Sequence, residues 1–549
     1  MAILWHPMDE TRGNRGRTIS RLNTMRLYRL SALTASIFFL FTPSIFGQLN
    51  FLGFYPSDEE NNDIWGYEDS LGNQYVLLGQ NSKTLILDVT DPNNIIPLHS
   101  IPGFQSQWRD IKTWNGFAYV TNDEGGGLDI IDLRYLPDSI HFERFTADTL
   151  NLQRAHNIFI DEKGYGYLFG SNLFTGGVDV FELNTINRYQ PTYLGSYTEE
   201  YVHDGYVRGD TMYLSEIRNG TQAIVDNSNP ENPTTLARFP TSSNFTHQCW
   251  LDSSGQYLVT VDEAEGANID VYDVSDLLDI KETDRYQRSE GSGVIPHNAF
   301  WIGDYLVASH YTDGVVLINA KRKNNVVEVG NFDTSPFPST PEFYGCWGVY
   351  PFFSNGMIAA SDIEEGLYLM QPQFPSAAYL EGNITEENTG FPLANIQVEI
   401  LGTDAIKRSR PSGDYSNGLD QAGTYAIRFS GKGCTSKIVP NVELALDSVT
   451  LLDVVLTCPG PPTSLSILAT DNPIQITPNP VQSSAWLEFP SASGTTTLDL
   501  YTLDGKLLMH LDNVSSNSLA MDLSHLDQGQ YYIRLTVDGQ SHTIPLVKE

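Results

Sequence analysis

Four histidines recur along the chain at nearly equal spacing. They are His156, His203, His247 and His297, separated by 47, 44 and 50 residues. If they project toward one axis, their neutral imidazoles could bind a divalent transition metal, and nearby carboxylates could orient the rings. In the structural alternative, each histidine hydrogen-bonds the backbone of a neighbouring repeat. A divalent metal at these residues is therefore a candidate cofactor.

Further polar and aromatic residues share the register of the histidines. In an antiparallel hairpin the start of the first strand lies beside the end of the second, so residues at both places should ring one mouth. The candidate ligand-binding residues are Arg109, Asp110, Asp204, Glu216, Asp262, Glu263, His310 and Trp347. Asp123, Glu124 and Asp362 end second strands in the same register, and Trp65, Trp108 and Tyr311 are aromatic candidates near the mouth.

The elements that position these residues are the strands of a sevenfold repeat. Seven short apolar segments, rich in β-branched residues, predict buried third strands. They are Leu85–Pro92, Leu128–Leu133, Val178–Leu183, Ala223–Asp226, Ile269–Val274, Val315–Asn319 and Leu367–Met370. The Asp residues that end several of them, Asp88, Asp132, Asp226 and Asp273, are expected to form turns.

First strands are predicted to open at Trp65, Arg109, His156, His203, His247, His297 and Trp347, in steps of 44 to 50 residues. Such a step fits a four-stranded blade, so the expected fold is all-β, with a seven-bladed β-propeller over residues 48–372. The seventh unit lacks a fourth strand, whereas Leu52–Tyr55 has the pattern of one. We therefore expect the segment around Leu52–Tyr55 to close the ring, which removes an exposed sheet edge.

The composition and the first residues indicate an exported protein. Of 549 residues, 32 are Lys or Arg and 67 are Asp or Glu, a net charge of −35 that would repel nucleic acid. Residues 1–47 are read as an N-terminal extension and signal peptide, with the signal beginning at about Met25 and an apolar run over Leu30–Phe41. That run is too short to span a bilayer, and no later segment resembles a transmembrane span.

The cysteines predict one disulfide. Cys434 and Cys458 lie in the same predicted domain and are expected to pair, whereas Cys249 and Cys346 belong to different repeats and are expected to be small buried residues.

Several motifs carry resemblances to known families. The LVIVD-type repeats with His-Asn, His-Asp and Trp-Gly openings resemble the choice-of-anchor B family of exported bacterial propellers, a resemblance that implies no particular activity. Residues 377–458, with Thr389–Ala394 and Ala422–Tyr425, resemble a carboxypeptidase regulatory-like β-sandwich that serves as a spacer or adhesion module.

Residues 459–473 have the composition of a linker. Residues 474–549, with Leu498–Lys506 and Gly529–Arg534, are similar to the C-terminal sorting domain of the type IX secretion system, which also folds as a small β-sandwich. This resemblance implies contact with that secretion machinery and an extracellular or outer-surface location.

The sequence favours a binding or adhesion protein over an enzyme. It contains no phosphate-binding loop, nucleophile elbow or His-Glu-x-x-His motif. The expected ligand is a glycan or a surface protein. The alternative is a metal-dependent carbohydrate-active lyase or hydrolase that uses the His-lined mouth, a reading that rests on analogy of fold.

Overall fold

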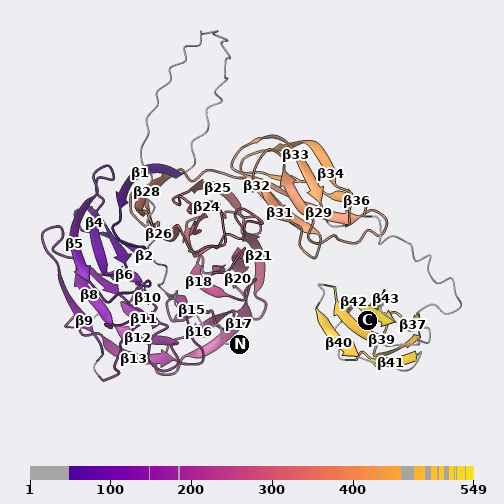
Figure 1. Cartoon of the computed structure of the whole chain (residues 1–549), viewed down its shortest axis with the longest axis horizontal. Coiled ribbons are helices and arrows are strands. Elements are labelled where there is room, and N and C mark those ends of the chain that lie inside the picture. The colour runs from indigo at the N-terminus through magenta and orange to yellow at the C-terminus, as the bar shows by residue number, and fades with distance from the viewer. Residues whose placement is uncertain are drawn as a thin grey trace, which may run out of the picture. The chain divides into compact units, whose positions relative to one another are not determined.

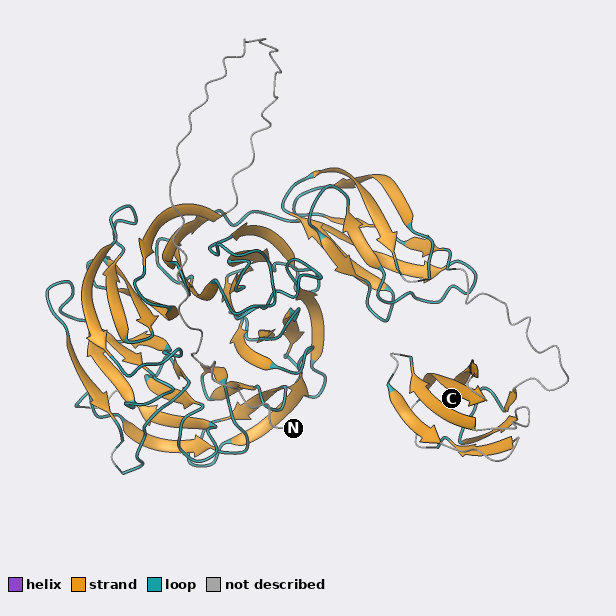
Figure 2. Cartoon of the chain, in the orientation of Figure 1, coloured by secondary structure: helices purple, strands orange, loops and turns teal. Residues whose placement is uncertain are grey.

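The computed structural model describes most of the chain after residue 48. Residues 49–458 are described apart from 148, 184, 185 and 432, as are 475–488, 496–503, 506–511, 518–524, 526, 528–537 and 540–548. The expected signal peptide (1–47) and linker (459–473) lie outside the described residues. The regular elements of the described part are strands (Figure 2). Among them no helix is long and apolar enough to cross a membrane.

Seven four-stranded antiparallel sheets follow one another around a ring between Leu49 and Pro372, as the blades of a propeller do (Figure 1). The strands of blades 1 to 3 are β2 (Asn61–Glu68), β3 (Gln74–Gln80), β4 (Lys83–Asp88), β5 (Ile96–Pro102); β6 (Ile111–Trp114), β7 (Phe117–Val120), β8 (Leu128–Asp132), β9 (His141–Phe145); and β10 (Asn157–Ile160), β11 (Tyr165–Phe169), β12 (Val178–Glu182), β13 (Thr192–Tyr197).

Blades 4 to 6 comprise β14 (Asp204–Arg208), β15 (Thr211–Glu216), β16 (Thr221–Asp226), β17 (Thr234–Pro240); β18 (Thr246–Leu251), β19 (Tyr257–Asp262), β20 (Ile269–Asp273), β21 (Lys281–Tyr286); and β22 (Asn298–Ile302), β23 (Tyr305–Ser309), β24 (Val315–Asn319), β25 (Val327–Phe332).

Blade 7 joins the two ends of the ring. It contains β26 (Cys346–Tyr350), β27 (Ile358–Asp362), β28 (Gly366–Pro372) and, as its outermost strand, β1 (Leu49–Pro56). β1 pairs antiparallel with β28, with Leu49 opposite Pro372 and Pro56 opposite Gly366. The predicted closure by the segment around Leu52–Tyr55 is confirmed.

The third strands and their turns agree with the sequence. Their central residues are buried, and each of the four predicted turn-forming Asp residues accepts a hydrogen bond from the backbone N–H two residues later. The acceptors are Asp88, Asp132, Asp226 and Asp273, at N···O distances of 2.9, 3.1, 2.8 and 2.9 Å.

Inner strands line the central channel, and three of them carry a side chain that accepts a hydrogen bond from the next blade. The Asp63 and Asp110 carboxylates accept the backbone N–H groups of Ile111 and Ile158, at 3.1 and 3.3 Å. The Gln248 side chain does the same for Ala299 at 3.0 Å. These side-chain oxygens serve backbone N–H groups of inner strands that have no further strand of their own sheet to pair with.

Aromatic side chains fill the channel two residues further along the inner strands. Trp65 of blade 1 contacts Phe300 of blade 6, with ring centroids 6.4 Å apart, and Phe352 stacks on Trp250 at 5.6 Å. We call this group the aromatic plug; its members are Trp65, Phe159, Tyr206, Trp250, Phe300, Tyr350 and Phe352. Trp65 thus lies in the plug, and its predicted place near the mouth is wrong.

Two further sheets follow the ring and enclose one apolar core. Their strands are β29 (Ala378–Glu386), β32 (Asp414–Leu419), β35 (Val449–Leu451), β36 (Val454–Leu456); and β30 (Gln397–Ile400), β31 (Ile406–Arg408), β33 (Gly423–Ser430), β34 (Lys437–Leu444). The predicted disulfide joins Cys434 to Cys458, and Cys249 and Cys346 are buried free thiols, as expected.

A buried carboxylate joins this segment to the ring. Asp284 of β21 accepts hydrogen bonds from Lys407 Nζ at 2.7 Å and Arg410 Nη2 at 2.8 Å. It also accepts the backbone N–H of Val326 at 2.7 Å. Removing one partner of a buried ion pair leaves the other charge buried and unpaired, which is unfavourable. This contact therefore couples the segment to the ring.

The C-terminal residues form two small sheets around a core of their own. Their strands are β37 (Gln475–Thr477), β38 (Ser484–Glu488), β41 (Ser518–Asp522); and β39 (Thr496–Thr502), β40 (Leu507–Leu511), β42 (Gly529–Val537), β43 (Gln540–Lys548).

Candidate functional site

One residue in each blade stands at the start of the inner strand, in the position that His156 occupies in blade 3. We call these seven the mouth positions: Asn62, Arg109, His156, His203, His247, His297 and Trp347. The aromatic members form a continuous arc. Their ring centroids are 4.1, 4.4, 4.4 and 4.9 Å apart in order from His156 to Trp347.

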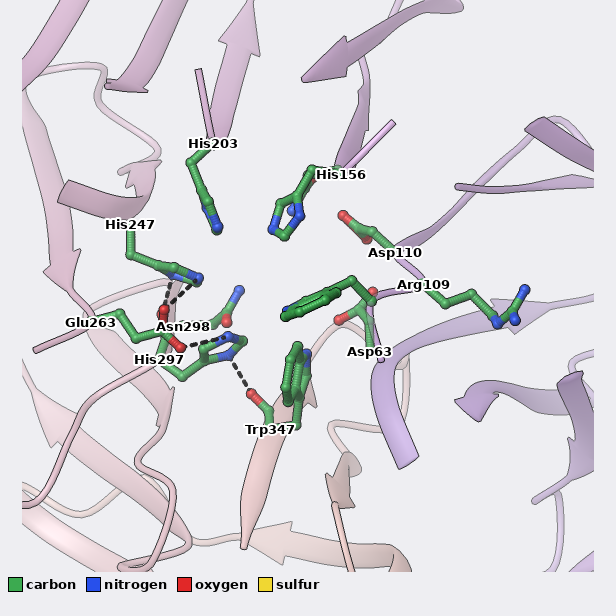
Figure 3. Close-up of a pocket in the computed structure, with 12 residues that line it drawn as sticks. Asp63, Arg109, Asp110, His156, His203, His247, Glu263, His297, Asn298 and Trp347 are labelled. Carbon is green, nitrogen blue, oxygen red and sulfur yellow. Dashed lines mark hydrogen bonds and ion pairs between the residues drawn. The ribbon is translucent and has the colours of Figure 1, made fainter. Parts of the chain in front are cut away.

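The arc encloses a pocket of about 50 Å³, which has room for an ion and a few waters. Figure 3 shows the four imidazoles turned toward a common space with Glu263 beside two of them. The lining residues are Asp63, Trp108, Arg109, Asp110, His156, Asn157, His203, His247, Glu263, His297, Asn298 and Trp347.

Two histidines and one carboxylate face one another within the pocket. The Nε2 atoms of His247 and His297 each lie 3.7 Å from an oxygen of Glu263. The Tyr311 hydroxyl donates a 2.5 Å hydrogen bond to that carboxylate. His247 Nδ1 lies 2.9 Å from the His297 carbonyl oxygen, and His297 Nδ1 lies 2.6 Å from that of Trp347. Both Nδ1 atoms therefore carry the proton, and both Nε2 lone pairs face the pocket.

Burial controls the ionisation of these groups. It lowers the pKa of His297 to about 3, and it lowers the pKa of His247 and His203 well below the usual value, with neighbouring imidazoles adding to the effect. Burial also raises the pKa of Glu263 to about 7. At neutral pH His203, His247 and His297 are therefore neutral, which suits metal or hydrogen-bond recognition rather than binding of an anion by charge.

The other two histidines are placed differently. His156 Nδ1 lies 3.0 Å from the carboxylate of Asp123, a residue predicted for this mouth. The His203 ring lies between the His156 and His247 rings and is tilted against both. The structure therefore brings all four predicted metal-ligand candidates together, with Glu263 next to two of them.

Four residues predicted for the mouth lie between the blades instead. Strand pairing shows that Glu216, Asp262, His310 and Asp362 occupy equivalent positions, one residue before the position of Glu263. Because successive side chains of a strand point to opposite faces, this one-residue step turns all four away from the channel. Glu216, for example, accepts hydrogen bonds from the Arg238 guanidinium of the outer strand β17.

The buried surroundings of the other three confirm this placement. Asp262 accepts the Ser243 backbone N–H at 2.6 Å, and Asp362 accepts the Thr334 hydroxyl at 2.8 Å. Burial lowers the pKa of His310 to about 4. Glu124 is exposed on the loop after β7.

Arg109, Asp110 and Asp204 stabilise the blades. The Arg109 guanidinium turns away from the histidines (Figure 3) and donates to the carbonyl oxygens of Gln80 and Phe104, at 3.1 and 2.6 Å. Asp110 joins two blades and pairs with Lys112 at 2.5 Å. Asp204 is buried outside the lining set, and burial, followed by the charge of Asp110, raises its pKa to about 7.

Sequence reasoning missed three residues that line the pocket, Asp63, Asn157 and Asn298. A signal was present, because each follows a mouth position and is a short side chain with an acceptor oxygen. Trp108 and Trp347 also line the pocket, whereas Tyr311 reaches it through Glu263.

Comparison with known proteins identifies the end of the chain. Residues 475–549 match the family of the secretion system C-terminal sorting domain. The type IX secretion machinery recognises such a domain, so the protein is exported to the cell surface or the extracellular space. No curated protein matches the sequence.

Solved structures similar to the ring include propellers. The β-propeller domain of Myceliophthora thermophila Cps50 (Swd1) is 13% identical, with a TM-score of 0.43 over 59% of this chain and 98% of that one. Chaetomium thermophilum Raptor is 8% identical, with a TM-score of 0.44 over 59% of this chain and 29% of that one.

Proposed function

We propose that this protein is an exported binding protein whose ring recognises a neutral glycan at the end that carries the histidines. Exposed aromatic side chains around the pocket are the observation that carries the proposal. The pocket supplies polar groups at the centre, and the surrounding loops supply apolar surface. This combination is typical of small-molecule and sugar sites.

Six exposed aromatic residues lie on loops that open at this end. In an antiparallel blade, the loop after the second strand and the loop after the fourth strand lie at the same end as the mouth positions. These loops carry Phe104, Phe174, Phe245, Phe337, Phe343 and Tyr344, each at least 40% exposed, which we call the aromatic rim.

Two members of the aromatic rim, Phe343 and Phe245, lie next to groups that contact Glu263. The Phe343 ring packs against Tyr311, whose hydroxyl binds Glu263. The Phe245 carbonyl oxygen accepts the Glu263 backbone N–H at 3.3 Å. A ligand stacked on the rim would therefore lie beside the polar groups of the pocket.

The charge of the protein selects among glycans. A net charge of −35 repels acidic polysaccharides, whereas a neutral sugar presents an apolar face to an aromatic ring and hydroxyl groups to carboxylates and imidazoles.

Affinity electrophoresis of the purified protein in gels that contain β-glucan, α-mannan or starch tests this proposal, with alginate as the acidic comparison. We expect at least one neutral polysaccharide to retard the wild type, and both Phe104→Ala and Phe343→Ala to weaken binding at least tenfold. Tyr135→Ala is the matched control, because Tyr135 is exposed on a loop at the opposite end of blade 2. No retardation by a neutral polysaccharide, or an equal loss in Tyr135→Ala, would contradict the proposal.

A metal-dependent carbohydrate-active enzyme is the second candidate. The grouping of His247, His297 and Glu263 favours it, since a metal held there would place an electrophile beside a bound sugar. An increase in reducing ends, or an unsaturated sugar product, after incubation with the retained polysaccharide would identify a hydrolase or a lyase. An unchanged polysaccharide would support a binding protein.

The remaining parts of the chain complete this proposal. Residues 377–458 serve as a carboxypeptidase regulatory-like spacer, supported by their two-sheet core and by the Asp284 contact. The ring belongs to the choice-of-anchor B propellers, supported by its seven LVIVD-type repeats.

A further inference from the structure

The pocket contains three donor atoms arranged around one point. The two Nε2 atoms and the Glu263 carboxylate lie within 4.8 Å of one another, and the two imidazole–carboxylate distances are 3.7 Å. These distances are too long for hydrogen bonds. They are close to the span of two ligands on one ion, because zinc–nitrogen and zinc–oxygen bonds are each about 2.1 Å.

Each of the three groups is already oriented by a partner behind it. The Nδ1 atoms of His247 and His297 donate to backbone carbonyl oxygens, which fixes the tautomer with Nε2 free toward the pocket. The Tyr311 hydroxyl fixes the carboxylate of Glu263. Metal-binding histidines and carboxylates are oriented in this way, so the site is preformed.

The burial of the groups argues against a simple structural role. His247 and His297 are each only 4% exposed. Their Nδ1 atoms alone make the hydrogen bonds to the next blade, so the fold does not use the Nε2 atoms that face the pocket. Both Nε2 atoms face the Glu263 carboxylate across 3.7 Å, so one ion between them would be in reach of all three donors.

We propose that His247, His297 and Glu263 bind one divalent transition-metal ion, with Tyr311 as the positioning residue for the carboxylate. Two imidazoles and one carboxylate favour Zn²⁺, Cu²⁺, Ni²⁺ or Fe²⁺ over Ca²⁺ and Mg²⁺, which prefer all-oxygen sites. His203, whose ring lies 4.4 Å from that of His247, is placed to offer a fourth nitrogen. His156 is engaged by Asp123 and lies further along the arc.

This inference stands apart from the glycan proposal. A metal that anchors sugar hydroxyls would join the two, but each is measured separately. A wild-type protein that binds one metal ion but no glycan would contradict only the glycan proposal. A wild-type protein that binds glycan but no metal ion would contradict only this one.

The test is a zinc titration of the chelator-stripped full chain, purified without a histidine tag, in competition with a chromophoric chelator. We expect one equivalent of Zn²⁺ to bind. Affinity should fall at least 100-fold in His247→Ala and His297→Ala and at least tenfold in Glu263→Gln and Tyr311→Phe. His141→Ala is the control, because that residue is exposed on β9, and its affinity should equal that of the wild type.

X-ray absorption of the zinc-loaded wild type needs no variant, so a variant that fails to fold cannot affect its result. The expected spectrum shows at least two imidazole nitrogens and one oxygen around the metal. Absence of stoichiometric binding, a spectrum without imidazole, or full affinity in folded His247→Ala would overturn the proposal.

Discussion

At the scale of single residues, the histidines of blades 5 and 6 divide their two nitrogens between two tasks. Nδ1 of His247 and of His297 binds a carbonyl oxygen of the following blade. Nε2 of each faces Glu263. The two interpretations that the sequence left open, a blade tie and a ligand site, therefore do not exclude each other.

The spacing of the repeat predicted the four histidines of the site, but the residues at the ends of the second strands only to within one step. Asp262 and Glu263 are adjacent and equally acidic, yet only Glu263 faces the channel. A single sequence does not reveal which of two neighbours points inward where a strand ends, because a bulge of one residue reverses the pattern. Such a shift occurs in β18 between Thr246 and Gln248.

A buried carboxyl in blade 5 gives a prediction on pH and stability. Burial raises the pKa of Asp270 to about 7, from about 3.8 in the unfolded chain. The folded state therefore holds this proton more tightly, and stability falls as the pH rises from 3.8 to 7. Between pH 5 and pH 8 this one carboxyl should cost the wild type about 3 kcal/mol, and Asp270→Asn should remove that cost.

Chemical denaturation at the two pH values measures this effect. We expect Asp270→Asn to stabilise the protein clearly more at pH 8 than at pH 5. Asp226→Asn should show no such contrast, because hydrogen bonds from Ser228 lower the pKa of that half-buried carboxyl and it is ionised at both pH values. An equal effect of Asp270→Asn at both pH values would contradict the assignment.

At the scale of elements, the third strands were the most predictable. Runs such as Val315–Asn319 are buried on both faces, so their composition alone identifies them. The first strand of blade 1 was misplaced because its mouth position is Asn62, which lacks the Arg, His or Trp found in the other blades. Strand β2 begins at Asn61, so the predicted start at Trp65 is four residues too late.

A glycine occupies the same position in the fourth strands of blades 3, 6 and 7, and close contact with the next blade explains two of these glycines. A Cβ atom at Gly53 or at Gly195 would lie 1.9 Å from the carbonyl oxygen of Pro92 or Pro230, respectively. Each of these prolines lies in the turn before the fourth strand of the next blade. Strand β1 therefore docks on blade 1 as β13 docks on blade 4, which is further evidence that β1 is a true blade strand.

We expect Gly195→Ala to destabilise the ring by about 1–3 kcal/mol, because the added methyl group must displace backbone. Ala237 occupies the equivalent position in blade 4, where pairing places it opposite Ile224 as Gly195 is opposite Val180. Ala237→Gly should therefore cost no more than about 1 kcal/mol. Thermal unfolding of both variants decides the matter, and equal midpoints would contradict the steric argument.

At the scale of the whole molecule, the chain combines a ring, a two-sheet segment coupled to it through Asp284, and a sorting domain with a separate core. The order of these parts was predictable, because each has its own pattern of strands. The coupling was not, since Asp284 lies more than 120 residues from Lys407 and nothing in the sequence pairs them.

Removal of residues 475–549 should retain the protein inside the cell envelope while the ring still folds. The sorting domain carries the export signal, whereas its core shares no residues with those of the ring. Fractionation of cells that express the truncated chain tests this expectation, with the full-length His247→Ala variant as an exported control. Truncated protein in the medium or on the surface would contradict it.

The central claim is that the mouth of the ring is a ligand site built around His247, His297 and Glu263. Anomalous diffraction at the zinc edge, from crystals of the zinc-loaded chain, tests this claim most directly. The account predicts one strong peak within about 2.1 Å of both Nε2 atoms and of a Glu263 oxygen. A pocket without an anomalous peak, or a peak that lies only at surface residues, would contradict it.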